Sequence, residues 1–206
     1  MTIIESWRTN PSLQPERRML IGGKWVEAAS GERIDVENPA TGEVFTTVPA
    51  ASAEDVNDAV RVARGTFENQ VWRGKKYTER AEIMWRWSDL ILKHVDELAE
   101  AETVDNSMPL AMAAGTVRYS ANTIRYFAGM CSKAYGRTME ISEHERQFHA
   151  YSTPEPVGVA GLITPWNGPI SVAATKSSSA LAAGCSVVLK PAEQAPITSL
   201  RLAQLA

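Results

Sequence analysis

Two short apolar runs in the last quarter of the sequence constrain the fold more than any other feature. Residues 157–163 and 186–189 lack the alternation of polar and apolar positions that a half-exposed strand shows. Continuous apolar runs of this length are typical of parallel strands that helices cover on both sides. Both runs therefore predict parallel strands buried on both faces.

The segments that follow these runs predict two helices. Pro169 begins an alanine- and serine-rich stretch that Gly184 can end, and Pro196 begins another helix that runs to the end of the sequence. The order strand, helix, strand, helix over residues 155–206 is that of a βαβ unit with a right-handed crossover. The expected fold class is α/β, and these residues begin its parallel sheet.

Three kinds of segment precede this unit. Residues 1–18 carry two prolines and predict an irregular arm. Residues 19–137 predict two hairpins, with turns at Gly22-Gly-Lys24 and Asn38-Pro-Ala-Thr-Gly42, followed by helices that pack against the sheet. Residues 138–154 predict a protruding β-ribbon with a charged turn, whose uncovered edges can pair with a partner.

Helix boundaries are predicted from capping residues. Ser52 precedes a cap-like run and is expected to begin the first helix. Thr78 is expected to cap a second, longer helix whose apolar stripe continues to Leu98. Pro109 suits the first turn of a third helix, which Gly136 is expected to end.

Composition argues against several classes of function. A net charge of −3 with scattered basic residues gives no electrostatic footprint for nucleic acid or an anionic membrane. No apolar run suits a signal-peptide core or reaches the roughly 20 residues that span a bilayer. Cys131 and Cys185 lack a pairing pattern and the three histidines lack ligand spacing, so no disulfide and no metal site is expected. The expected location is the cytoplasm.

Polar side chains follow both predicted strands. Asn167 comes just after the first strand, and Lys190 and Glu193 lie at and past the end of the second. Open α/β sheets bind ligands outside the carboxyl ends of their strands, so the three residues are expected at one rim. A lysine and a glutamate there can bind ribose hydroxyls, although no Gly-x-Gly-x-x-Gly fingerprint follows the first strand. These residues indicate a nucleotide site, and the alternative for Lys190 is a solvated surface lysine.

Three motifs resemble the aldehyde dehydrogenase superfamily, whose members use NAD(P). They are residues 155–167 (Glu-Pro-Val-Gly-Val-Ala-Gly-Leu-Ile-Thr-Pro-Trp-Asn), 180–184 (Ala-Leu-Ala-Ala-Gly) and 187–194 (Val-Val-Leu-Lys-Pro-Ala-Glu-Gln). Pro-Trp-Asn alone is a weak signal, but Lys-Pro-Ala-Glu at the matching distance makes chance similarity improbable. The resemblance runs from about Leu20 to the end and implies an aldehyde dehydrogenase-like fold with part of a Rossmann-type sheet.

The resemblance also implies a role for each motif residue. The side-chain amide of Asn167 would donate to the oxyanion formed when a cysteine thiolate attacks the aldehyde, a contact typically worth ~10²–10³ in rate. The positions matching Lys190 and Glu193 hold the adenosine ribose. A glutamate at the second of them favours NAD over NADP, because its charge repels a 2′-phosphate, and NADP stays the alternative. The residues implied to bind the cofactor are Ile163, Thr164, Pro165, Trp166, Asn167, Lys190, Ala192 and Glu193.

The reaction implied is oxidation of an aldehyde to a carboxylic acid through a cysteine thiohemiacetal and a thioester. The family's nucleophilic cysteine and its glutamate base are expected beyond the position where this sequence ends, and neither Cys131 nor Cys185 matches the nucleophile by motif. The sequence is therefore expected to be the cofactor-binding N-terminal portion, in which residues 138–154 form the arm that joins a homo-oligomer, a dimer or a tetramer. The alternative is a non-catalytic fragment or split-gene product that binds nucleotide or a partner subunit.

Two positions depart from the family pattern. Gly168 stands where relatives often carry a larger residue beside the substrate channel. Its two interpretations are space for a bulky aldehyde and a backbone angle φ above zero, which glycine adopts easily. Ser177-Ser-Ser179 replaces a stretch that usually ends in proline, and is expected to change only helix packing.

Overall fold

The βαβ unit predicted near the end of the sequence is present in the computed structural model, which describes residues 17–206. Strands β7 (Val159–Ile163) and β8 (Ser186–Lys190) pair in parallel, in a register that runs from Val159 opposite Ser186 to Ile163 opposite Lys190. Helix α6 (Pro169–Ala182) connects the strands and α7 (Ile197–Gln204) follows the second one. Most of the predicted irregular arm, residues 1–16, lies outside the described residues.

Helix α6 ends as its sequence predicts. Gly184 adopts φ +92°, a left-handed angle that residues with a side chain rarely adopt. Its N–H donates to the carbonyl of Leu181 at 2.9 Å, and the N–H of Cys185 donates to that of Ala180 at 3.0 Å. These two bonds are the Schellman arrangement that closes a helix, so the glycine fixes where the chain turns into β8.

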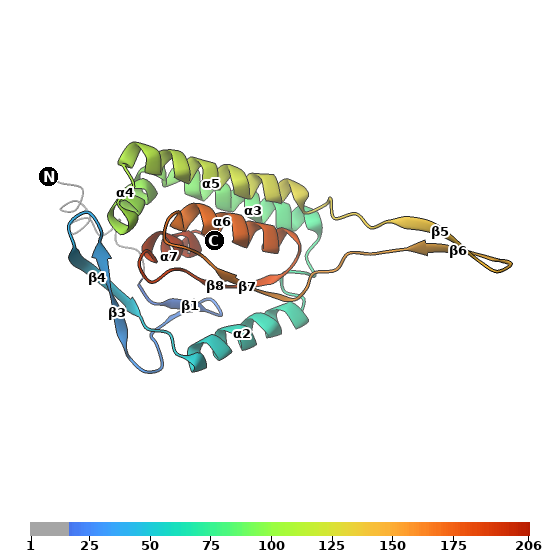
Figure 1. Cartoon of the computed structure of the whole chain (residues 1–206), viewed down its shortest axis with the longest axis horizontal. Helices are drawn as coiled ribbons and strands as arrows, with labels where there is room; N and C mark the ends of the chain where they lie inside the picture. Colours follow the sequence, from blue (N-terminus) through green and yellow to red (C-terminus); the bar gives the residue numbers. More distant parts are fainter. Residues whose placement is uncertain (1–16) are drawn as a thin grey trace.

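The prediction that both strands are buried on both faces is wrong for β7, and in β8 only Ser186 is buried while residues 187–189 are half-buried. Helix α2 (Ala53–Glu68) and α6 contact the β7–β8 pair from opposite sides (Figure 1). Ile163 nevertheless exposes 70% of its surface and Gly161 is also exposed. Within residues 17–206, β8 is the only strand that pairs with β7, so the other edge and the carboxyl end of β7 remain open.

Both predicted hairpins form in the N-terminal part of the described chain. The first pairs β1 (Met19–Ile21) with β2 (Lys24–Val26), and the second pairs β3 (Arg33–Asn38) with β4 (Glu43–Pro49). The Asn38 side chain accepts the N–H of Ala40 at 2.8 Å and so stabilises the second turn. The second hairpin lies at the end of the molecule opposite the ribbon (Figure 1).

The predicted start of α2 is confirmed, and the predicted start of the next helix is wrong. Ser52 caps α2, because its N–H donates to the Asp55 carboxylate at 2.8 Å and its hydroxyl accepts the Asp55 N–H. The next helix, α3 (Tyr77–Lys93), already contains Thr78 within its first turn. The carboxylate of Glu79 accepts the N–H of Lys76 at 2.8 Å, so the glutamate stabilises this helix start instead of a threonine cap.

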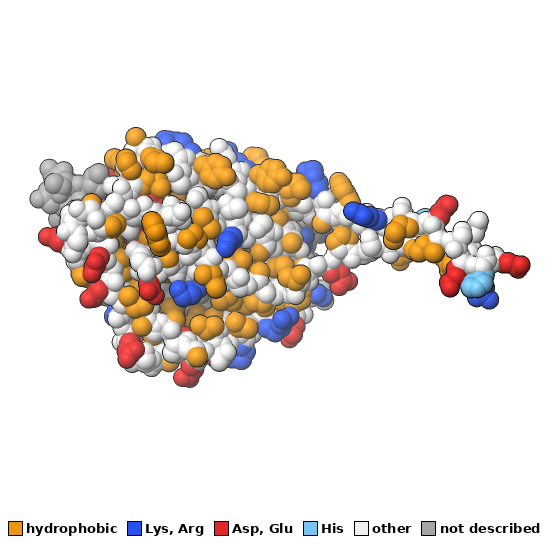
Figure 2. Space-filling view, in the orientation of Figure 1, with side chains coloured by type: hydrophobic (Ala, Val, Ile, Leu, Met, Phe, Trp, Pro, Cys, Tyr) orange, Lys and Arg blue, Asp and Glu red, His pale blue; other side chains and the backbone are white. Residues whose placement is uncertain are grey.

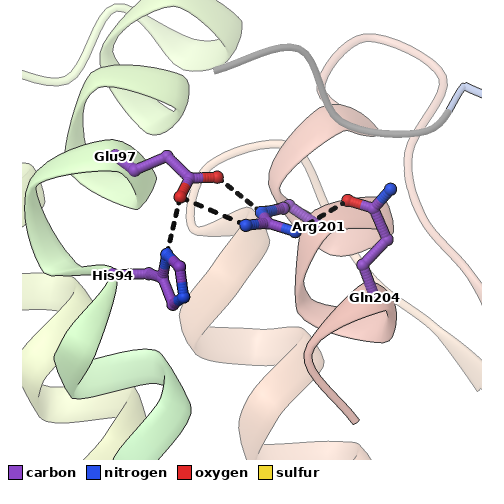
Figure 3. Close-up of polar contacts among 4 residues, drawn as sticks. All are labelled: His94, Glu97, Arg201 and Gln204. Carbon is purple, nitrogen blue, oxygen red and sulfur yellow. Dashed lines mark hydrogen bonds and ion pairs between the residues drawn. The ribbon is translucent and has the colours of Figure 1, made fainter. Parts of the chain in front are cut away.

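The apolar stripe from Met84 to Leu98 is buried as predicted, but it belongs to two helices. Helix α3 ends before His94, and α4 (Val95–Asn106) begins directly after it as a separate helix. The Glu97 carboxylate binds both His94 and Arg201 of α7, so polar contacts as well as apolar packing hold the junction between α3 and α4 in place (Figure 3). Apolar periodicity does not reveal the break, because the stripe keeps its spacing across it.

Helix α5 (Leu110–Met130) follows Pro109 as predicted, but it ends before Gly136. Gly136 has a different role, because a Cβ built on it would lie 1.7 Å from the carbonyl oxygen of Ser152. The glycine therefore permits the two segments of backbone at the base of the ribbon, around Gly136 and Ser152, to lie against each other. Helices α3, α4, α5, α6 and α7 enclose the main core, whose largest buried side chains include Met84, Ile91, Leu98, Ile124, Ile170 and Leu202.

The predicted ribbon is formed by β5 (Thr138–Glu143) and β6 (Arg146–Tyr151), and it projects from the body (Figure 1). Nearly all of its residues are exposed. Ile141 lies opposite Phe148, and both belong to an apolar face along the ribbon, whose tip carries charged side chains (Figure 2). No helix within residues 17–206 combines the length and the apolar character needed to cross a membrane.

Candidate functional site

The two motif-bearing turns begin side by side at the carboxyl ends of β7 and β8. Ile163 is the register partner of Lys190, and the N–H of Thr164 donates to the Lys190 carbonyl at 3.1 Å. The parallel ladder thus continues one residue beyond β7 before the chain turns at Pro165. Parallel sheets place ligand sites at this edge, so the fold brings the predicted residues to the expected part of the sheet.

Exposed apolar side chains border this edge. Ile163 exposes 70% and Trp166 61% of its surface, whereas Thr164 is only 3% exposed. The Thr164 hydroxyl is buried and has no hydrogen-bond partner among residues 17–206. Unpaired buried hydroxyls are uncommon in folded proteins, and apolar side chains left open beside one are typical of the wall of a binding site.

The residues predicted for the site lie in two places, one beside Ile163 and the other in a pocket next to the second hairpin. Lys190 is exposed beside Ile163, and its ammonium donates to the Pro191 carbonyl at 3.2 Å. Glu193 and Trp166 instead line a surface pocket of about 520 Å³ next to the second hairpin. Within residues 17–206, no hydrogen bond or ion pair joins Lys190, Glu193 and Asn167 to one another. The remaining predicted residues are Pro165 and Asn167, which are exposed, and Ala192, which is half-buried.

Two residues that the sequence analysis did not assign also contact this edge. The ammonium of Lys176 in α6 donates to the Ile163 carbonyl at 2.6 Å. The side-chain amide of Asn106, the last residue of α4, donates to the Trp166 carbonyl at 2.9 Å. No local sequence pattern marks either contact, because 13 positions separate Lys176 from Ile163 and 60 positions separate Asn106 from Trp166.

Two buried carboxyl groups lie behind the site. Asp105 accepts the N–H of Ile197 at 2.8 Å and that of Thr198 at 3.3 Å, and so binds the first turn of α7. Burial raises the pKa of Asp105 well above its ordinary value, although these bonds partly oppose the shift. Glu102 is fully buried, and burial raises its pKa to about 7. No group of three or more His, Cys, Asp or Glu residues within 17–206 is arranged to hold a metal ion.

The two cysteines are free and buried. Cys131 lies at the end of α5, where burial raises the pKa of its thiol and so disfavours the reactive thiolate. Cys185 lies between Gly184 and the first residue of β8 and is 4% exposed. Both positions are those of inert structural cysteines, which agrees with the absence of a nucleophile motif around either.

The glycine after Asn167 does not adopt a left-handed backbone angle. Gly168 precedes α6 and has φ −169°, so the interpretation that it serves a left-handed angle is wrong. A Cβ at this position would lie 3.0 Å from the Ser171 hydroxyl and 3.8 Å from Cγ2 of Val172. A side chain here would therefore press against the Ser171 hydroxyl in the first turn of α6, which would have to shift by a few tenths of an ångström.

Comparison with known proteins gives one family. A profile of the aldehyde dehydrogenase family matches residues 25–206. The chain is 41% identical to phenylacetaldehyde dehydrogenase of Pseudomonas fluorescens over 210 residues, which cover 100% of this chain and 42% of that protein. It is 39% identical to the NADP(+) succinate-semialdehyde dehydrogenase of Escherichia coli over 199 residues, covering 97% of this chain and 40% of that one.

Solved structures agree with the sequence relatives. Betaine aldehyde dehydrogenase from Staphylococcus aureus in complex with NAD⁺ superimposes with a TM-score of 0.89 at 33% identity, covering 98% of this chain and 39% of that one. The chain thus spans about two fifths of the length of the relatives it matches. Since the family profile matches nearly all of the described residues, the chain belongs to the aldehyde dehydrogenase family.

Proposed function

We propose that this chain is the cofactor-binding part of an NAD(P)-dependent aldehyde dehydrogenase. The observation that carries the proposal is the register of the parallel strands, in which Ile163 lies opposite Lys190. This register brings the Pro-Trp-Asn turn and the Lys-Pro-Ala-Glu turn to one edge of the sheet, where α/β proteins bind nucleotides.

The residues at this edge suit a dinucleotide. The Lys190 ammonium and the Glu193 carboxylate are exposed and can bind ribose hydroxyls, while Ile163 and Trp166 offer apolar surface. The buried Thr164 hydroxyl, which has no hydrogen-bond partner among residues 17–206, can form one with the cofactor. Pro165, Asn167 and Ala192 complete the set that we assign to the cofactor. We propose NAD as the preferred cofactor over NADP, because the Glu193 carboxylate would repel a 2′-phosphate.

The proposed chemistry assigns one catalytic role within this chain. A cysteine thiolate from outside residues 1–206 attacks the carbonyl carbon, and the Asn167 amide donates to the oxygen that becomes negative. When bound, NAD supplies the acceptor for the hydride that leaves this carbon. Water then hydrolyses the resulting thioester, which releases the carboxylic acid and restores the thiol. The buried positions of Cys131 and Cys185 are the reason for seeking the nucleophile elsewhere.

Two variants in the protein expressed from its complete reading frame test these roles. Asn167→Ala should lower kcat by about 10²–10³, while the Kd for NAD changes little, because its contact forms only in the transition state. Lys190→Ala should raise the Kd for NAD. The controls are Asn57→Ala and Lys75→Ala, which change exposed residues of the same types outside the site. A swapped pattern would refute the role assignment.

A second experiment separates the enzyme from its alternative. The chain of residues 1–206 alone should bind NAD but oxidise no aldehyde. Turnover that Cys131→Ala or Cys185→Ala abolishes would place the nucleophile within this chain. Nucleotide binding without turnover by the product of the complete reading frame would instead favour a non-catalytic nucleotide-binding subunit.

We also propose that the ribbon joins subunits into a homo-oligomer, a dimer or a tetramer. Its support is the exposed apolar face that carries Ile141 and Phe148 on a two-stranded ribbon with open edges. Ile141→Lys should lower the mass measured by sedimentation, whereas Ser142→Lys, on the opposite face, should not. A single-subunit mass for the unchanged protein would refute the proposal.

A cytoplasmic location is proposed from the cysteines. Both are free, as is usual in a reducing compartment. Fractionation of cells that express the complete reading frame tests the location. Recovery of the protein outside the cytoplasmic fraction would contradict it.

A further inference from the structure

The turn that carries Asn167 receives a hydrogen bond from another element. The side-chain amide of Asn106 donates to the carbonyl oxygen of Trp166 at 2.9 Å. This carbonyl belongs to the same planar peptide unit as the backbone nitrogen of Asn167. Fixing the oxygen therefore fixes the plane from which the Asn167 side chain departs.

The other hydrogen bonds between this turn and its neighbours, within the described residues, lie at its ends. The N–H of Thr164 donates to Lys190 at one end, and the carbonyl of Gly168 accepts from Ser171 and Val172 in α6 at the other. Between them, within the described residues, the Asn106 amide is the only hydrogen bond that reaches residues 165–167 from another element. Asn167 itself is exposed, so packing does little to orient its side chain.

Asn106 is itself held firmly. It is the last residue of α4, and the preceding Asp105 is 1% exposed. The Asp105 carboxylate accepts the N–H groups of Ile197 and Thr198 at the start of α7. The end of α4 thus contacts both motif regions, because α7 follows the turn that carries Lys190 and Glu193. This arrangement gives the Asn106 amide a fixed point from which to hold the Trp166 carbonyl.

We propose that Asn106 is a positioning residue that orients Asn167 for oxyanion binding. The proposal rests on the role assigned to Asn167 in the proposed function. Its physical basis is that a catalytic donor must be aimed closely, since a misplacement of about 1 Å can cost about 10²-fold in rate. In this role Asn106 acts through the Trp166–Asn167 peptide.

A double-mutant cycle in the product of the complete reading frame tests the coupling. Asn106→Leu keeps the shape of the side chain and removes the donor, and it should lower kcat by about tenfold with the KM for aldehyde and the Kd for NAD within about twofold. In the Asn167→Ala background, the same change should have almost no further effect on kcat. An equal loss of kcat in both backgrounds would overturn the proposal.

A conservative variant keeps the cycle interpretable if Asn106→Leu folds poorly. Asn106→Gln retains the amide at the end of a chain one methylene longer, and it should restore part of the kcat that Asn106→Leu loses. Asn106→Asp should not, because an ionised carboxylate cannot donate to the Trp166 carbonyl. Equal kcat values for the Gln and Asp variants would refute the role of the donor.

Amide hydrogen exchange gives a readout that needs no activity and can use residues 1–206. Asn106→Leu should speed exchange in the segment 164–168 and leave α5 and α7 unchanged. Unchanged exchange in that segment, or faster exchange throughout α4 and α7, would overturn the proposal. If the unchanged protein oxidises no aldehyde, the proposed function fails, whereas this exchange pattern still decides whether Asn106 holds the turn.

Discussion

The guanidinium of Arg201 binds the carboxylate of Glu97 through two hydrogen bonds, from Nε at 2.5 Å and from Nη2 at 3.1 Å (Figure 3). Both side chains are mostly buried, and they join α7 to α4 across 104 positions of sequence. His94 and Gln204 extend the contact on either side. Since α7 follows the Lys190–Glu193 turn and α4 ends at Asn106, this pair connects the supports of the two motif turns.

Removing this arginine should destabilise the fold. Arg201→Met would leave the partly buried Glu97 carboxylate without its main partner, and the expected loss is about 1–3 kcal/mol in the free energy of unfolding. Arg61→Met is the matched control, because Arg61 pairs with Asp58 on an exposed surface, where such pairs contribute roughly 0–1 kcal/mol. Urea unfolding of residues 1–206 measures both, and equal losses would contradict the structural role of Arg201.

Stability should fall as pH rises because of Glu102. Burial raises its pKa from 4.5 to about 7, so the folded protein binds this proton more tightly than the unfolded chain does. The contribution of Glu102 to the free energy of unfolding is therefore fully present below about pH 4.5 and is lost as pH rises to about 7. The total loss is on the order of 3 kcal/mol. Glu102→Gln should make this part of the profile less steep, with the raised pKa of Asp105 accounting for the slope that remains. Glu68→Gln, at an exposed position, should leave the profile unchanged. Identical pH profiles for the protein and Glu102→Gln would argue against a perturbed Glu102.

Ser107 is an unfavourable residue at the end of α4. It adopts φ +61° and ψ 19°, a left-handed conformation that costs a residue with a side chain about 1–2 kcal/mol. Ser107→Gly should therefore raise the free energy of unfolding by about 0.5–1 kcal/mol, after the greater freedom of glycine in the unfolded chain is subtracted. Ser107→Ala keeps the strain and serves as the control. A glycine variant no more stable than the alanine variant in thermal unfolding would contradict the strain.

Gly168 should influence which aldehydes are oxidised. Its φ of −169° removes the left-handed explanation, and a side chain here would displace the Ser171 hydroxyl and contact Val172 next to Asn167. We expect the product of the complete reading frame to prefer benzaldehyde to acetaldehyde in kcat/KM, and Gly168→Phe to lower that ratio about tenfold. The loss corresponds to about 60 Å² of apolar contact at roughly 25 cal/mol per Å². Gly168→Ala adds only Cβ and should change the ratio less. An unchanged ratio in a folded, active Phe variant would refute the channel hypothesis.

The sequence alone determined the elements whose signals are local. Ser52 and Gly184 predicted the start of α2 and the end of α6 correctly, and the two apolar runs predicted where strands form, because capping bonds and strand propensity follow from neighbouring residues. The family motifs likewise placed the candidate site at the ends of β7 and β8. In these places local preference and the final fold agree.

The tertiary structure decided what depends on contacts far apart in the sequence. The break at His94, the early end of α5 and the exposure of Ile163 are invisible to periodicity, which records only which positions are apolar. The contacts of Asn106 with Trp166 and of Asp105 with Ile197 join positions 60 and 92 residues apart. Side-chain hydrogen bonds of this kind form only after the packing of α4 against α6 and α7 has brought donor and acceptor within about 3 Å, so no local pattern in the chain encodes them.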